Sequence, residues 1–114
     1  MAELKFELAE EICTDEVKDF ILETNRCINL YAQKNQDYGN SFDKGMDTIG
    51  MSYGVGRLYD KINRLITLSN PKQKQQVKDE SIDDTLRDLA CYSIMMLVYR
   101  KKEIENKQKE INFE

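Results

Sequence analysis

Histidine and tryptophan are both missing from this chain of 114 residues. Without histidine, the protein lacks the most frequent metal ligand and general base of enzyme sites. A bound metal would therefore have to be a hard cation such as Mg²⁺, held by carboxylates. The three cysteines, Cys13, Cys27 and Cys91, form no C-x-x-C pair, which argues against a zinc or redox motif. We expect reduced thiols in a cytoplasmic protein.

The chain also lacks an excess of positive charge and a long apolar run. Charged residues make up 33% of it and apolar residues 40%, with a net charge of −4 and a pI near 5.0. An acidic chain is not expected to follow a long nucleic-acid backbone. No stretch is long enough to cross a membrane, and the acidic N-terminus does not fit a signal peptide. The length predicts one domain over residues 1–114 with a small core.

Glycine is scarce and confined to one stretch. All five glycines lie between Gly39 and Gly56, and glycine permits both positive φ and close approach of a ligand to the backbone. We therefore predict a long glycine-rich loop over residues 39–56. It lies between K-N-Q-D-Y-G (34–39) and R-L-Y-D-K-I-N-R (57–64), so amides, aromatic rings and cations are concentrated here. This mixture suits a small anionic ligand with a flat ring, such as a nucleotide.

The remaining segments predict an all-α fold, a small bundle of three main helices. The first helix should begin after Thr14 as N-cap and end near residue 37. The second should span about residues 57–69, and the third should run from a cap at Ser81 to at least residue 102, after a polar linker. Residues 1–13 fit a short strand or a helix equally well, and 1–13 and 103–114 are predicted to be peripheral tails. Helical spacing predicts a core stripe on the first helix, formed by Val17, Phe20, Ile21, Thr24, Cys27, Ile28 and Tyr31.

The third predicted helix carries no charge on any side from Leu89 to Tyr99. A helix that is apolar all round is usually buried all round, and two further helices in a small domain cannot cover it. We therefore predict a homo-oligomer, either a dimer or a tetramer.

Cations and one carboxylate are the candidate binding groups, and each has a structural alternative. Lys34 and Tyr38 continue the buried edge of the first helix, where they face a pocket or form a solvated helix end. Arg57, Lys61 and Arg64 follow one flank of the second helix, as phosphate ligands, as a solvated stripe or as partners of acids on another helix.

Asp88 lies two turns into the third helix, between two leucines, and we expect it to be partly buried. It either forms an ion pair with Lys61 or Arg64, or serves as a metal ligand or as an acceptor for a base or ribose.

Three elements in order carry a family resemblance: K-N-Q-D-Y-G-N-S-F, R-L-Y-D-K-I-N-R-L and V-K-D-E-S-I-D-D-T-L-R-D-L-A-C-Y. Over roughly residues 28–95 the chain resembles the nucleotide-modification-associated domain family common in phages, and more distantly the MazG-like all-α nucleotide pyrophosphohydrolases. The resemblance implies a helical bundle that assembles into dimers or tetramers and handles nucleotides. The family residues that it places on this chain are Lys34, Asp37, Tyr38, Ser41, Phe42, Arg57, Asp60, Lys61, Arg64, Glu80, Asp84 and Asp88.

The chain departs from the MazG-like pattern at the metal site. Those enzymes set an E-E-x-x-E element against an E-x-x-D element to hold Mg²⁺, whereas the first helix here reads C-I-N-L-Y-A-Q-K-N-Q-D. We therefore predict a nucleotide-binding protein without catalytic residues or a cofactor, a phage-type sponge that sequesters a linear or cyclic nucleotide immune signal in the host cytoplasm. Its predicted site comprises Lys34, Asp37, Tyr38, Ser41, Phe42, Tyr53, Arg57, Lys61, Arg64, Asp84 and Asp88.

The alternative is an Mg²⁺-dependent nucleoside triphosphate pyrophosphohydrolase. In that case the metal ligands would be Asp60, Glu80, Asp84 and Asp88.

Overall fold

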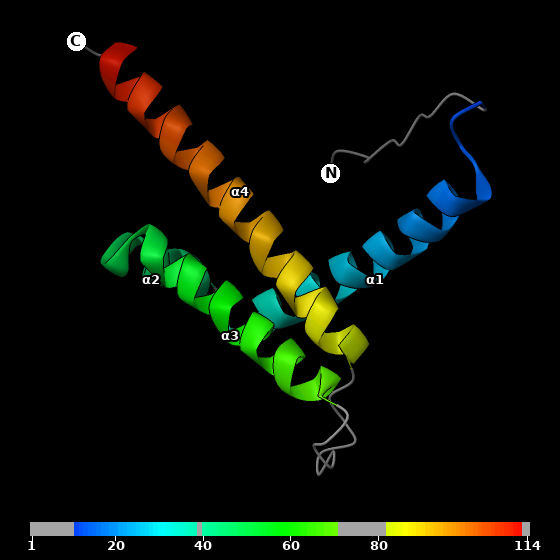
Figure 1. Ribbon diagram of the computed structural model, residues 1–114. Helices are drawn as coiled ribbons and strands as arrows, with labels where there is room; N and C mark the ends of the chain where they lie inside the picture. The colour runs from blue at the N-terminus through cyan, green and yellow to red at the C-terminus, as the bar shows by residue number, and fades with distance from the viewer. Residues whose placement is uncertain (1–10, 39, 71–81, 113–114) are drawn as a thin grey trace.

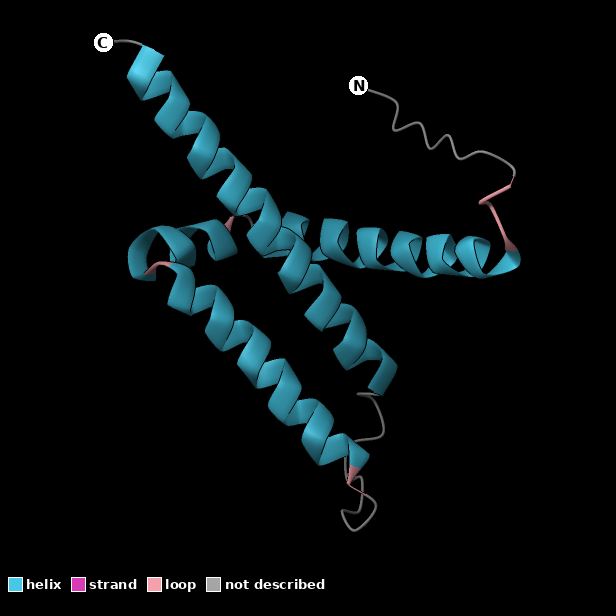
Figure 2. Ribbon diagram, turned by 45° about the horizontal axis from the view of Figure 1, so that its top comes forward, coloured by secondary structure: helices cyan, strands magenta, loops and turns pink. Residues whose placement is uncertain are grey.

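A computed structural model describes residues 11–38, 40–70 and 82–112. This part of the chain contains four helices and no strand, which confirms the all-α prediction (Figures 1 and 2). The helices are α1 (Asp15–Tyr38), α2 (Ser41–Ile49), α3 (Met51–Ser69) and α4 (Ile82–Asn112). The longest, α4, packs most extensively against α3, and α1 crosses it on another side. No helix in the described segments combines the length and apolar character needed to cross a membrane.

The first helix begins where its sequence predicts. The Thr14 Oγ1 accepts a hydrogen bond from the Val17 N–H at 3.3 Å, which satisfies one of the unpaired donors of the first turn. Asp15 and Glu16 stand in that turn, where carboxylates favour the positive end of the helix dipole. The N-cap prediction is therefore confirmed.

The predicted glycine-rich loop over 39–56 is wrong, because most of this segment is helical. α2 occupies residues 41–49 and α3 begins at Met51, so the described chain has four helices rather than three. Only Gly50 lies between these two helices. It has φ of +95°, and its N–H donates to the Met46 carbonyl at 2.8 Å. Glycine makes the sharp turn there because it pays no side-chain penalty at positive φ.

Two other glycines of this segment, Gly45 and Gly54, serve close packing inside helices. A Cβ placed on Gly45 would lie 2.4 Å from the Tyr53 ring, and one on Gly54 would lie 2.8 Å from the Met96 Cε. The absence of a side chain, which suggested a loop, instead allows two helices to approach each other. Because glycines of this segment lie within a helix rather than in a loop, α3 starts six residues earlier than the second helix predicted from the sequence.

The core lies where α2 and α3 meet the middle of α4. Phe42, Met46 and Met96 are buried, and two polar contacts fasten α2 to α4. The Tyr99 hydroxyl donates to the Asp47 carboxylate, which raises the pKa of Tyr99 to about 12. Lys102 pairs with Asp43 at 3.7 Å. The remaining partly buried side chains of this core are Tyr53, Leu58, Tyr92, Met95 and Tyr99.

The predicted core stripe of the first helix is only partly buried within one chain. In the first helix, Phe20 is 74% exposed and Ile28 is 50% exposed, although both belong to the predicted core stripe. Phe20 is exposed because it belongs to the N-terminal half of α1, which projects away from the other helices (Figure 1). In α4, Ile94 and Leu97 are exposed in the single chain, which agrees with the expectation that one chain cannot cover this helix, and their burial by a second copy stays a prediction.

The third predicted helix ends at Asn112, which agrees with the prediction that it runs to at least residue 102, and residues 103–112 of the predicted tail are its last turns. The Ser81 cap, the linker, Glu80 and residues 1–10 lie outside the described residues.

Candidate functional site

A pocket of about 270 Å³ opens where the C-terminal half of α1 meets the start of α2, the first half of α3 and the middle of α4. All four helices contribute to it. The lining residues are Leu30, Tyr31, Lys34, Asn35, Ser41, Phe42, Tyr53, Arg57, Asp88, Cys91, Tyr92 and Met95. Six of the predicted site residues are therefore brought together: Lys34, Ser41, Phe42, Tyr53, Arg57 and Asp88.

At one side of this pocket, two lysines from different helices converge on one carboxylate. Lys34 of α1 donates to the Asp88 Oδ1 at 2.9 Å, and the Lys61 Nζ of α3 lies 3.1 Å from the Asp88 Oδ2. Asp88 and Lys61 are only 20% and 25% exposed at their side chains, whereas Lys34 is 52% exposed. The predicted ion pair between Asp88 and Lys61 is present, and Lys34 joins it.

The charges of this triad stabilise one another against partial burial. Burial raises the pKa of Asp88, but the hydrogen bonds and positive charges of Lys34 and Lys61 outweigh burial and lower it overall. Burial also lowers the pKa of Lys34, and the Asp88 carboxylate reverses this effect and raises it. The shifts of Asp88 and Lys34 both favour the charged forms of these two groups.

A third cation lies on the α3 side of the pocket. The Arg57 guanidinium is 5.1 Å from the centroid of the Tyr53 ring and donates to the Tyr53 hydroxyl at 3.2 Å. This hydrogen bond raises the pKa of Arg57 further. Tyr53 is one turn before Arg57 on the same helix, so helical spacing brings the two together.

Aromatic rings form the floor of the pocket. The Phe42 ring is centred 5.8 Å from the Tyr53 ring and 5.9 Å from the Tyr92 ring, tilted against both. Phe42 is 7% exposed, so it shapes the wall and offers little ring surface for stacking. Tyr53 and Tyr92 are half-buried, and their rings are the more accessible ones.

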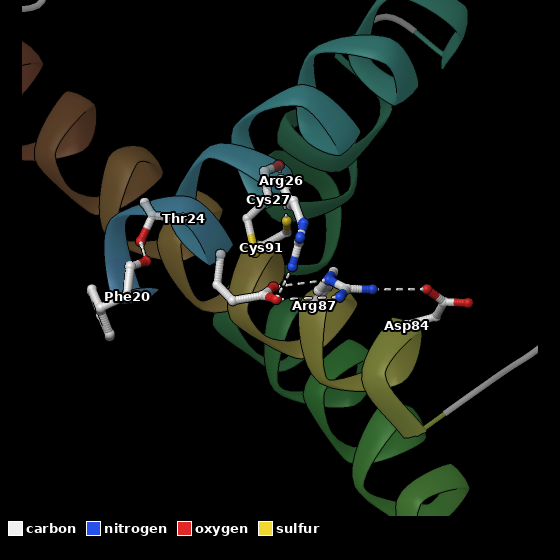
Figure 3. Close-up of polar contacts among 8 residues, drawn as sticks. Phe20, Thr24, Arg26, Cys27, Asp84, Arg87 and Cys91 are labelled. Atoms are coloured by element: carbon white, nitrogen blue, oxygen red, sulfur yellow. Dashed lines mark hydrogen bonds and ion pairs between the residues drawn. The ribbon is translucent and has the colours of Figure 1, made fainter. Parts of the chain in front are cut away.

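Asp84 is held in a different cluster from the pocket. Arg87 of α4 binds Asp84 at 3.2 Å on one side and the Glu23 carboxylate of α1 at 3.1 Å on the other. Figure 3 shows Arg87 reaching Asp84, with Cys27 and Cys91 close to each other nearby. The Cys91 thiol donates to the Cys27 carbonyl at 3.5 Å, and burial raises the pKa of Cys91 to about 11. This cluster fastens α1 to α4.

The other predicted site residues are placed less directly. Lys61 pairs with Asp88, which lines the pocket, but Lys61 itself is not a lining residue. Arg64 is half-buried one turn further along α3. Asp60 is exposed and does not line the pocket. The side chains of Asp37 and Tyr38 lie outside what the structure describes, as does Glu80.

The metal ligands of the alternative are not gathered in the described part of the chain. No group of three or more cysteine and carboxylate side chains comes together there. Asp88 uses both oxygens on lysines and Asp84 pairs with Arg87. A divalent cation at these positions would have to displace ammonium and guanidinium groups first.

Several lining residues are not among those predicted from the sequence. Tyr31 lies one turn before Lys34, and Asn35 follows Lys34 directly. Tyr92 lies one turn after Asp88. Neighbours at i±3 and i±4 share a helix face, and this spacing is the signal that could have identified Tyr31 and Tyr92.

A family model described as nucleotide modification associated domain 1 matches residues 34–99, more than half of the chain. The matched region starts at Lys34 and includes α2, α3 and most of the core. No match was found among curated proteins or among solved structures.

Proposed function

Because this chain belongs to the nucleotide modification associated domain 1 family, we propose that its four-helix pocket binds a small nucleotide. One observation carries the proposal. Two cations, Lys34 and Arg57, line one pocket together with a single carboxylate, Asp88, and a third cation, Lys61, pairs with that carboxylate. The pocket region thus has a surplus of positive charge in a chain whose net charge is −4.

The cations have donors left for phosphate oxygens. An ammonium has three N–H donors and a guanidinium has five, whereas Lys34 gives one hydrogen bond to Asp88 and Arg57 gives one to Tyr53. Both side chains are anchored, so a phosphate would meet cations that are already positioned. Pre-positioning reduces the side-chain entropy lost on binding.

The aromatic floor supports the nucleoside half of the ligand. Tyr53 and Tyr92 line the pocket beside the cations, and stacking a base on an aromatic ring contributes roughly 1–3 kcal/mol. The pocket volume of about 270 Å³ is just below the range of roughly 300–1,000 Å³ that is usual for small-molecule sites. One nucleotide unit therefore matches it better than a long strand.

We further propose that the protein holds its ligand without cleaving it. Both oxygens of Asp88, the most central carboxylate, are engaged by lysines, so it serves to position cations rather than to activate water. In this proposal the protein is a sponge that sequesters a linear or cyclic nucleotide immune signal, in the host cytoplasm if the chain is phage-encoded. No cofactor is required in this scheme.

We also propose that the protein works as a homo-oligomer, a dimer or a tetramer. Among the described residues only Phe42, Met46, Cys91 and Met96 form a buried apolar core, and large exposed apolar side chains are numerous. Contact with a second copy removes such surface from water, which contributes about 25 cal/mol per Å².

The test is a binding and release experiment on the full chain. The pure protein is incubated with nucleoside triphosphates and with cyclic di- and trinucleotides, each with and without Mg²⁺. Binding is measured by calorimetry, and the ligand released by heat is analysed. We expect at least one nucleotide to bind and to be recovered intact.

The matched variants are Lys34→Met and Arg57→Met, with Lys44→Met as the control because Lys44 is an exposed lysine of α2 outside the pocket lining. Loss of one charge-assisted hydrogen bond, about 1.5–3 kcal/mol, should weaken binding roughly 10- to 100-fold in the two pocket variants only. Equal affinity in all three variants would contradict the site. Monophosphate and pyrophosphate formed only with Mg²⁺ would instead establish the hydrolase alternative.

A further inference from the structure

The apolar stripe of α1 is symmetric about one residue. Counted from Thr24, its members stand three, four and seven positions away in both directions along the helix. The six flanking residues are Val17, Phe20, Ile21, Cys27, Ile28 and Tyr31. When two copies of such a helix pack antiparallel about a two-fold axis at Thr24, Phe20 meets Ile28 of the other copy and Val17 meets its Tyr31. A two-fold interface requires this kind of self-complementary surface.

Much of this stripe is available for contact. Phe20, Ile28 and Tyr31 are 74%, 50% and 41% exposed. At the centre, the Thr24 hydroxyl donates to the Phe20 carbonyl at 2.8 Å. The hydroxyl of Thr24 thus has a hydrogen bond within its own helix, so two copies can approach closely here without burying an unpaired polar group.

A groove beside the stripe offers a place for the partner's aromatic ring. This groove of about 180 Å³ lies between α1 and α4, and Cys27, Ile28 and Tyr31 face Ile94, Met95 and Val98 across it. Its surface is mainly apolar. The N-terminal half of α1 and the C-terminal half of α4 diverge from each other (Figures 1 and 2). A Phe20 ring placed opposite Ile28 would enter this groove.

Charge favours the antiparallel arrangement. Residues 15–23 of α1 contain four acids and one lysine, whereas residues 24–36 contain two cations, Arg26 and Lys34, and no acid. Antiparallel packing sets the acidic half of one helix against the half of the other that contains no acid. Parallel packing would set like charges side by side.

We propose that a second copy of this chain docks on the groove through α1, with a two-fold axis at Thr24. The groove and the nucleotide pocket share a wall formed by Tyr31, Asn35, Phe42, Cys91 and Met95. The docked copy therefore supports this wall from behind and completes the nucleotide pocket. This second part rests on the proposed function, whereas the interface itself does not. Because coupling between sites is reciprocal, nucleotide should also tighten the dimer.

The test compares two exposed apolar residues of the same helix. Phe20→Glu places a charge in the interface, and Leu22→Glu is the matched control. Leu22 is 56% exposed and lies about 160° around the helix from Thr24, at 100° per residue. Sedimentation velocity should show dimers for the natural chain and Leu22→Glu, and monomers for Phe20→Glu. A monomeric natural chain, or equal masses for both variants, would overturn the interface.

Cross-linking at the axis tests the register independently of any destabilisation. In Thr24→Cys the new thiols of two copies face each other, so oxidised glutathione should join them in an intermolecular disulfide and be reduced to two thiols. Leu22→Cys should remain at the background level of the natural chain. No enrichment for Thr24→Cys over Leu22→Cys would rule out an axis at this residue.

Nucleotide affinity tests the coupling separately. We expect Phe20→Glu to bind nucleotide at least about 10-fold more weakly than Leu22→Glu, although residue 20 is outside the pocket lining. Equal affinities in a monomer and a dimer would overturn the completed pocket. If the natural chain dimerises but binds no nucleotide, the proposed function fails while the interface stands.

Discussion

Asp88 shows how one carboxylate controls the arrangement of a pocket. It bonds Lys34 of α1 and Lys61 of α3, so three helices meet at its two oxygen atoms. Each cation is also partly removed from water and needs a partner there. Asp88 therefore has a structural effect that can be separated from ligand binding.

We predict that Asp88→Asn lowers the free energy of unfolding by about 1–2 kcal/mol at pH 7, because it leaves two lysines near an uncharged amide. The lysines lower the pKa of Asp88 in the folded chain below its ordinary value. A lowered folded pKa means that this stabilisation is complete above the unfolded pKa of about 4 and is lost as the pH falls through the folded pKa.

Urea denaturation at several pH values checks this prediction. The difference between the natural chain and Asp88→Asn should be constant from pH 7 to about pH 5 and should shrink below about pH 4. A difference that persists unchanged at pH 3 would show that the triad is not its source.

At the scale of elements, glycine determines how closely α3 can approach α4. Gly54 is buried, and a Cβ there would lie 2.8–3.0 Å from three atoms of the Met96 side chain. Gly56, two residues later in the same helix, has open space at its Cβ position. Substitutions at Gly54 and Gly56 therefore separate the effect of helix propensity on stability from the effect of packing.

We predict opposite effects for the two alanine substitutions. Gly56→Ala should raise the free energy of unfolding by about 0.5–1 kcal/mol, because alanine favours the helix. Gly54→Ala should lower it by about 1–2 kcal/mol, because the gain in propensity is smaller than the cost of overpacking against Met96. Thermal or chemical denaturation measures both, and stabilisation by Gly54→Ala would contradict the close approach of α3 and α4.

At the scale of the whole molecule, one chain covers too little of its apolar surface. The projecting halves of α1 and α4 carry exposed Phe20, Leu97 and Ile104. Single exposed apolar residues are ordinary, but contiguous patches mark interfaces. The stability of the protein should therefore depend on assembly.

We predict that the melting temperature of the natural chain rises with protein concentration. Mass action stabilises a dimer as its subunits become more concentrated. Scanning calorimetry over a 100-fold concentration range should show a rise of several degrees for the natural chain and for Leu22→Glu. Phe20→Glu should melt at one temperature throughout, and a natural chain that behaves in the same way would argue against assembly.

Local signals in the sequence determined the helical class, the start of α1 and the residue types around the pocket. Thr14, the acids that follow it and the 3.6-residue periodicity act within a few positions, so no partner is needed to recognise them. The pairing of Asp88 with Lys61 was also foreseeable, because a carboxylate between leucines on a helix requires a cation when it is buried.

Only the tertiary structure decided what the glycines do and which cations meet. Gly45 and Gly54 permit contact with Tyr53 and Met96 rather than forming a loop, and a missing side chain has the same appearance in sequence for both uses. Lys34 and Asp88 lie 54 positions apart in the sequence. Asp84 forms an ion pair with Arg87, although it lies only one helical turn from Asp88. Such choices depend on how helices pack across space, and periodicity within one helix carries no information about its neighbour.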